Sequence, residues 1–98
     1  MPKGAKLTKK TGQDYHEYSY SKSLPGGGSI SSVDISSGYG GKVIMRGTDN
    51  NGVRFTTSYI ISSGNIQHSM SNPKFTSSDL DILYELGVEF SKSYGYRS

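Results

Sequence analysis

The chain holds two histidines, the side chains whose unperturbed pKa lies nearest neutrality. His16 lies between two carboxylates, Asp14 and Glu17. Consecutive residues of a strand point to opposite faces, so His16 and Glu17 cannot converge on one ion, and a structural zinc needs about four ligands. His68 is expected on the buried face of a strand beside Tyr59. The sequence therefore predicts no metal site.

Glycine, serine and acidic residues also fail to form a catalytic pattern. Residues 38–43 read G-Y-G-G-K-V, which puts Val43 where a phosphate loop needs Ser or Thr to hold Mg²⁺. No serine lies in a G-x-S-x-G turn. Asp81, Glu85 and Glu89 follow one helical face, which is typical of a solvated surface. The sequence therefore predicts no catalytic residue, no cofactor and no enzyme activity.

Length and charge predict one small domain with a basic beginning. The 98 residues are 32% hydrophobic, which is enough for one modest core, and they carry a net charge of +3. Four lysines fall in the first ten residues: Lys3, Lys6, Lys9 and Lys10. Residues 1–13 lack hydrophobic periodicity and are predicted to form a disordered basic arm. Residues 14–98 are predicted to form a single α+β domain.

Cellular location is constrained by what the sequence lacks. There is no cysteine, so no disulfide or thiolate chemistry is possible. The basic start is not followed by an apolar signal region, and no apolar run reaches the ~20 residues of a membrane span. A cytoplasmic protein without a membrane partner is therefore expected.

Residues 41–61 contain the strongest structural signal, two alternating runs around Asn50-Asn51-Gly52. A three-residue loop at Asn50-Asn51-Gly52 pairs Asp49 with Val53 and keeps the apolar side chains of both strands on one face. A two-residue loop would put them on opposite faces. The preferred loop predicts three pairs: Gly47 with Phe55, Met45 with Thr57, and Val43 with Tyr59.

The same argument extends the sheet on both sides. Residues 29–36 should pair with the central hairpin, Ile35 opposite Val43 and Val33 opposite Met45. A turn at Ser63-Gly64 should set residues 65–70 against the second strand, with Ile61 opposite Ile66 and Tyr59 opposite His68. Residues 14–21 alternate and are rich in Tyr, which predicts an edge strand.

The C-terminal segment has the period of a helix. Over residues 80–94 one broad side is apolar, and Ser77 or Ser78 can cap the start. Gly87 lies within that side, which predicts close approach of helix to sheet. The apolar side is formed by Leu80, Ile82, Leu83, Leu86, Gly87, Phe90 and Tyr94. The predicted fold is α+β, an antiparallel β-meander of four to five strands with one C-terminal helix packed on one face.

One sheet face is left without a cover, and it defines the predicted site. By strand parity this face carries Ile30, Ser32, Asp34, Gln67 and Ser69 around a central set. The predicted partner-binding residues are Lys42, Ile44, Arg46, Arg54, Thr56, Ser58 and Ile60, together with Tyr18 and Tyr20 of the edge strand. Asp34 is diagonal to Lys42 and Arg46 and should offset part of their charge.

Two functions are compatible with this surface. The first is a non-enzymatic binding protein, of the inhibitor, adaptor or immunity type, that docks on a protein partner. It could also form a homodimer through the edge strand at residues 14–21. The alternative is nucleic-acid binding, with Tyr18, Tyr20 or Tyr39 stacking on bases. Its predicted residues are Lys3, Lys6, Lys9, Lys10, Lys42, Arg46 and Arg54.

Overall fold

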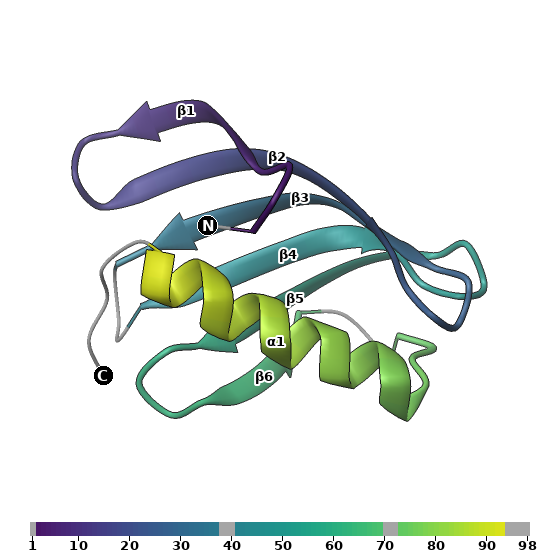
Figure 1. The fold of residues 1–98 in the computed structure, drawn as a ribbon. Coiled ribbons are helices and arrows are strands. Elements are labelled where there is room, and N and C mark those ends of the chain that lie inside the picture. The colour runs from purple at the N-terminus through teal and green to yellow at the C-terminus, as the bar shows by residue number, and fades with distance from the viewer. Residues whose placement is uncertain (1, 38–40, 70–72, 94–98) are drawn as a thin grey trace.

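The computed structural model describes residues 2–37, 41–69 and 73–93. Within them, six strands form one antiparallel sheet in sequence order, and a single helix crosses one face (Figure 1). The elements are β1 Lys6–Thr11, β2 Tyr15–Ser23, β3 Ser29–Ser36, β4 Lys42–Thr48, β5 Arg54–Ile60, β6 Asn65–His68 and α1 Ser77–Ser93. The predicted α+β meander is confirmed, with six strands in place of four to five.

The β4–β5 hairpin has the predicted three-residue loop. The Asp49 amide donates to the Val53 carbonyl at 2.8 Å, and Gly52 closes the turn with a φ of 78°. A positive φ costs glycine little because it has no Cβ. The predicted cross-strand pairs between β4 and β5, and those between β3 and β4, are all present.

The register between β5 and β6 differs from the prediction by two residues. Tyr59 pairs with Ile66 and Thr57 pairs with His68. The connection spans residues 61–64, and the amide of Gly64 donates to the Ile60 carbonyl at 2.8 Å. An even shift leaves each side chain on its predicted face, because strand side chains alternate with period two.

The disordered arm expected over residues 1–13 is corrected by β1, which pairs with β2 along its length. Every residue of β1 is exposed, so apolar burial does not hold it. Backbone pairing to β2 holds β1 in place, and such pairing leaves no hydrophobic pattern in the sequence. Because β2 lies between β1 and β3, it is internal and cannot serve as the predicted edge strand or dimer contact.

Two bulges bend the β2–β3 hairpin toward the start of α1. The register shifts between Ser19 and Lys22 on β2, and between Ile30 and Ser32 on β3. A bulge inserts one residue and reverses the facing of those beyond it. Ile30 is therefore buried at 1% exposure in the core, where strict alternation had placed it on the uncovered face.

The core lies between α1 and one face of the sheet. Leu83, Leu86 and Phe90 of the helix belong to the same buried cluster as Val43, Met45 and Phe55 of the strands. Partly buried Tyr59 packs against that cluster, so the predicted common apolar face is confirmed. A Cβ on Gly87 would overlap the Tyr59 ring, which confirms the predicted close approach. Tyr94 lies outside the described residues.

Thr76, rather than Ser77 or Ser78, caps the helix. Its hydroxyl accepts the Asp79 amide at 3.1 Å, and the Asp79 carboxylate accepts the Thr76 amide at 2.9 Å. This reciprocal pair is a capping box with Asp at the position usually held by Glu. Asp79 also accepts the amide of Gly26 at 2.8 Å, which ties the bent β2–β3 hairpin to the helix start. A second buried carboxylate, Asp49, accepts the amide of Lys74 at 3.0 Å.

Candidate docking surface

The sheet face opposite α1 is called the open face here. Seven predicted partner-binding residues lie on it, on two adjacent strands: Lys42, Ile44, Arg46, Arg54, Thr56, Ser58 and Ile60. Ile44 pairs with Ser58 and Ile60 pairs with Lys42, so the two isoleucines lie diagonal to one another. Both isoleucines are half-buried, and Arg54 is exposed. The structure thus brings the central predicted set together.

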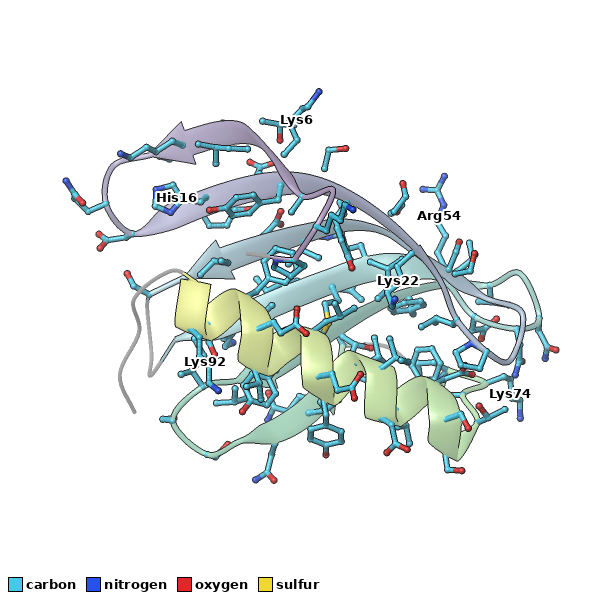
Figure 2. All side chains as sticks on the ribbon, viewed as in Figure 1. Lys6, His16, Lys22, Arg54, Lys74 and Lys92 are labelled. Atoms are coloured by element: carbon cyan, nitrogen blue, oxygen red, sulfur yellow. The ribbon has the colours of Figure 1, made fainter. Side chains whose placement is uncertain are left out.

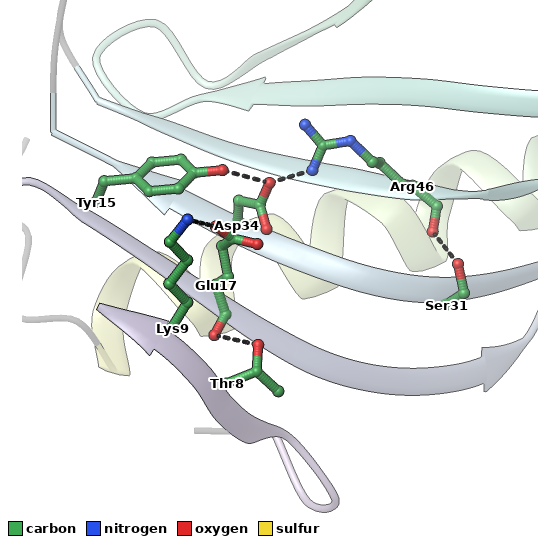
Figure 3. A network of polar contacts seen from close by, with 7 residues as sticks. All are labelled: Thr8, Lys9, Tyr15, Glu17, Ser31, Asp34 and Arg46. Atoms are coloured by element: carbon green, nitrogen blue, oxygen red, sulfur yellow. Dashed lines mark hydrogen bonds and ion pairs between the residues drawn. The ribbon is translucent and has the colours of Figure 1, made fainter. Parts of the chain in front are cut away.

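A polar network crosses the open face from β2 to β4 (Figure 3). Asp34, at 3% exposure, accepts a hydrogen bond from the Tyr15 hydroxyl at 2.9 Å and pairs with the Arg46 guanidinium. Burial raises the pKa of the Tyr15 hydroxyl, and the hydrogen bond to Asp34 raises it further, so Tyr15 remains a donor. The predicted compensation of charge by Asp34 is realised at Arg46.

The network continues to the edge strand. Lys9 lies 4.0 Å from the Glu17 carboxylate, and the Thr8 hydroxyl donates to the Glu17 carbonyl at 3.2 Å (Figure 3). On the other side, the Ser31 hydroxyl donates to the carbonyl of Arg46 at 3.3 Å. Polar side chains therefore link four strands across a face that has no apolar cover among the described residues.

Three hollows on the open face are lined entirely by residues that the structure describes. The first hollow, about 470 Å³, is lined by Arg46, Arg54 and the hydroxyls of Ser29, Ser31, Ser32, Thr48 and Thr56. The second, about 420 Å³, adds Tyr15, Glu17 and Asp34 to Arg46 and the β3 serines. A third of about 400 Å³ is lined by Lys42, Ser58, Gln67, His68 and Ser69. Arg46 separates a hollow without carboxylates from one that contains two.

Tyr18 and Tyr20 lie on the other side of the sheet, under the helix. Their rings meet the ring of Phe90 edge to face, with centroids at 5.8 and 5.5 Å. Burial raises the pKa of both hydroxyls, for Tyr20 with a further contribution from Glu89. The rings of both residues therefore belong to the core face, and only Tyr18 also contributes to the lining of the second hollow. Tyr39 lies outside the described residues.

The lysines of the N-terminal segment are exposed but divided between the faces. Lys6 pairs with Ser19 and Lys9 with Glu17, both on the open side, whereas Lys10 pairs with buried His16. Lys3 precedes β1 and is exposed. Of these four, Lys6 and Lys9 therefore add positive charge to the open face.

The two histidines do not form a common site. His16 lies on β2, where it pairs with Ile35 of β3. Strands β3, β4 and β5 separate it from β6, which carries His68. His68 is exposed at the far edge, with Nδ1 2.9 Å from the Thr57 hydroxyl, so its partner is Thr57 rather than Tyr59. Partial burial of the ring lowers the pKa of His68. The part of the chain that the structure describes contains no group of three or more residues suited to hold a metal.

Sequence reasoning missed Tyr15 and the hydroxyls of Ser29, Ser31 and Thr48 as parts of this surface. The parity of residues 14–21 already separated Tyr15 from Tyr18. What it lacked was the position of that strand next to β3, which brings Tyr15 to Asp34. The bulge at Ser31 could not be read from alternation, because an inserted residue breaks the period on which alternation depends.

Comparison with known proteins does not bear on the use of this surface. No protein-family model, no curated protein and no solved structure matches the chain. Among the described residues, α1 lacks the length and apolar character of a membrane-crossing helix.

Proposed function

We propose that this chain is a small non-enzymatic binding protein that docks on an acidic surface of a protein partner through its open face. The observation that carries the proposal is the asymmetry of the sheet: α1 covers one face, and no described element covers the other (Figure 1). The proposal extends to inhibitor, adaptor or immunity-type roles and to a cytoplasmic location, which the lack of cysteine fits.

Charge favours an acidic partner. On the open face Arg46 is paired with Asp34 and Lys9 with Glu17, which leaves Lys6, Lys42 and Arg54 without a described ion pair. The outer face of α1 carries the exposed acids Asp81, Glu85 and Glu89, so the two sides of the molecule differ in sign. Complementary charge steers association, while the half-buried isoleucines supply apolar contact.

The test is capture of proteins from an extract by the immobilised chain, with the bound proteins quantified by mass spectrometry. The double substitution Ile44→Asp and Ile60→Asp should abolish capture, because it places negative charge on the centre of the surface. Tyr84→Asp is the matched control: Tyr84 is an exposed ring on α1, away from the open face. Proteins retained equally by all three forms would contradict the proposal, once circular dichroism shows that each variant is folded.

Nucleic acid is the second candidate, favoured by the five cations Lys6, Lys9, Lys42, Arg46 and Arg54 on one side of the sheet. Tyr18 and Tyr20 pack against Phe90 under the helix, so two of the three tyrosines predicted to stack on bases are not available for it. Binding would then rest on phosphates, and its affinity would fall steeply with salt, with a slope of roughly −0.9 per phosphate on duplex DNA. A flat salt response would reject this candidate.

A further inference from the structure

The first hollow of the open face is chemically unlike its neighbours. It is lined by two arginines, five hydroxyl-bearing residues, Gly47 and Phe55, and by no carboxylate. The hydroxyl-bearing residues are Ser29, Ser31, Ser32, Thr48 and Thr56. Every charged group in its lining is therefore a hydrogen-bond donor. Arginine donates through a planar fork that matches the oxygens of a carboxylate or phosphate, and hydroxyls can donate to the oxygens that remain.

The two arginines are placed to act together. Arg54 pairs directly with Thr48, and Arg46 precedes Thr48 by two residues on the same face. The two side chains therefore start from diagonal positions, roughly 7–8 Å apart. Arg46 contributes one nitrogen to Asp34, and Arg54 projects from the sheet on the side away from α1, with no described ion pair (Figure 2). Asp34 already offsets part of the Arg46 charge, and an anion between the two guanidinium groups would offset the repulsion that remains.

We propose that this hollow binds a phosphoryl group on the protein partner, that is, a phosphorylated serine, threonine or tyrosine side chain. The inference rests on the proposed docking function and names the group that is recognised. A phosphoryl group carries a charge of about −1.5 to −2 and three acceptor oxygens at neutral pH. These oxygens match the Arg54 guanidinium, the Arg46 nitrogens that are not paired with Asp34, and the hydroxyls of Ser29, Thr48 and Thr56. A single carboxylate would match them less well, because it offers two oxygens and one charge.

The adjoining hollow argues against a nucleic-acid strand as the source of the phosphate. A polyanion that crosses the sheet would pass from Arg46 to the carboxylates of Glu17 and Asp34. Its next phosphates would meet negative charge there. A single phosphoryl group on a peptide fills the first hollow and places no further negative charge in the second.

The first experiment uses inorganic phosphate as the probe. In a titration at constant ionic strength against chloride, the backbone amide signals of Ser31, Thr48 and Arg54 should shift in NMR spectra. Arg54→Gln should weaken phosphate binding by about tenfold or more, because it removes a charge-assisted donor. Lys92→Gln is the control: it makes the same charge change at an exposed lysine in the last turn of α1, outside the open face. Equal weakening by both variants, or no shift at these amides, would overturn the proposal.

The second experiment separates the possible sources of the anion. A peptide with one phosphoserine should bind more tightly than the same peptide with Ser or Glu at that position, and more tightly than oligothymidylate at equal phosphate concentration. Equal binding of the Glu peptide would overturn phosphoryl recognition and leave docking on an acidic protein intact. Tighter binding of oligothymidylate would overturn it in favour of nucleic acid. Loss of partner capture in the Ile44 and Ile60 variant tests the docking function separately, since neither residue lines this hollow.

Discussion

The two faces of the sheet use the same strands but are held by different forces. On the core face, side chains such as Val43, Met45 and Phe90 are buried together in one hydrophobic cluster. On the open face, Asp34 is equally buried, yet it lies among Tyr15 and Arg46. Apolar burial stabilises in proportion to area, whereas a buried carboxylate must first recover the solvation that it lost. The comparison teaches that burial alone does not tell which face of a strand carries the stability.

The largest effect is expected on the core face. Phe90→Ala removes a fully buried ring that packs on Tyr18 and Tyr20, and it should lower the free energy of unfolding by about 3–5 kcal/mol. Ile44→Ala, a half-buried aliphatic on the open face, should cost about 1 kcal/mol or less. Urea unfolding followed by circular dichroism measures both. Similar losses for the two variants would remove the distinction between the faces.

The next largest loss of stability is expected from the hydrogen bonds of Asp79, which join the β2–β3 hairpin to the start of α1. Asp79→Asn weakens hydrogen bonds from the amides of Gly26 and Thr76 and should cost about 2 kcal/mol. Asp81→Asn, an exposed acid two residues further along the helix, should change stability by less than about 0.5 kcal/mol. A cost for Asp79→Asn no larger than that of Asp81→Asn would show that the helix start is held by packing alone.

Lowering the pH should weaken the same hydrogen bonds of Asp79 in the unmodified chain. Burial alone would raise the pKa of Asp79, but donation by the amides of Thr76 and Gly26 outweighs it and lowers the pKa. The amide of Lys74, followed by those of Val53 and Asn51, lowers the pKa of Asp49. Groups with depressed folded pKa values stabilise fully above the unfolded value near 3.8, and that stability is lost as pH falls toward the folded values. Unfolding between about pH 5 and pH 2 should therefore show a decline that Asp79→Asn reduces.

A smaller effect is expected within the polar network. Tyr15→Phe removes one hydrogen bond to Asp34 and leaves the Arg46 partner in place, so it should cost about 1 kcal/mol. The measurement is again the midpoint of urea unfolding. A loss as large as that of Phe90→Ala would mean that the network, and not the core, organises β2 and β3.

The smallest effect is expected at the sheet edge. Glu17→Gln breaks the ion pair with Lys9, whose side chain is 65% exposed. Exposed ion pairs contribute about 0–1 kcal/mol, and solvent screening places this one in the lower half of that range. Hydrogen exchange of the β1 amides in the variant would detect any loosening. A loss well above 1 kcal/mol would show that β1 depends on this contact rather than on backbone pairing.

Most of the fold followed from the alternation of side chains, and the exceptions share one cause. The β3, β4 and β5 registers were predicted because Val33, Met45 and Thr57 must share a buried face. The bulge that buries Ile30 and the four-residue turn before β6 are local backbone choices with no period to reveal them. β1 was missed because its side chains are all exposed, and pairing through backbone groups is invisible to a hydrophobic pattern.

The candidate site was predicted in its centre and missed at its margins. Lys42, Ile44 and Arg54 were placed on the open face by parity alone. Tyr18 and Tyr20 were predicted to bind a partner as part of an edge strand, because the neighbours of their strand were unknown. The first hollow could not be predicted, since it depends on where the Ser31 bulge and Arg54 lie in space.

The edge strand β1 has a consequence for how copies of this chain meet. Its outer edge offers unpaired backbone groups to any strand that approaches, which is how sheets fuse into fibrils. Lys6, Lys9 and Lys10 lie along that edge, so two such edges brought together would crowd ammonium groups of both molecules. The lysines that resemble a loose basic tail in the sequence thus lie where they oppose the pairing of two β1 edges.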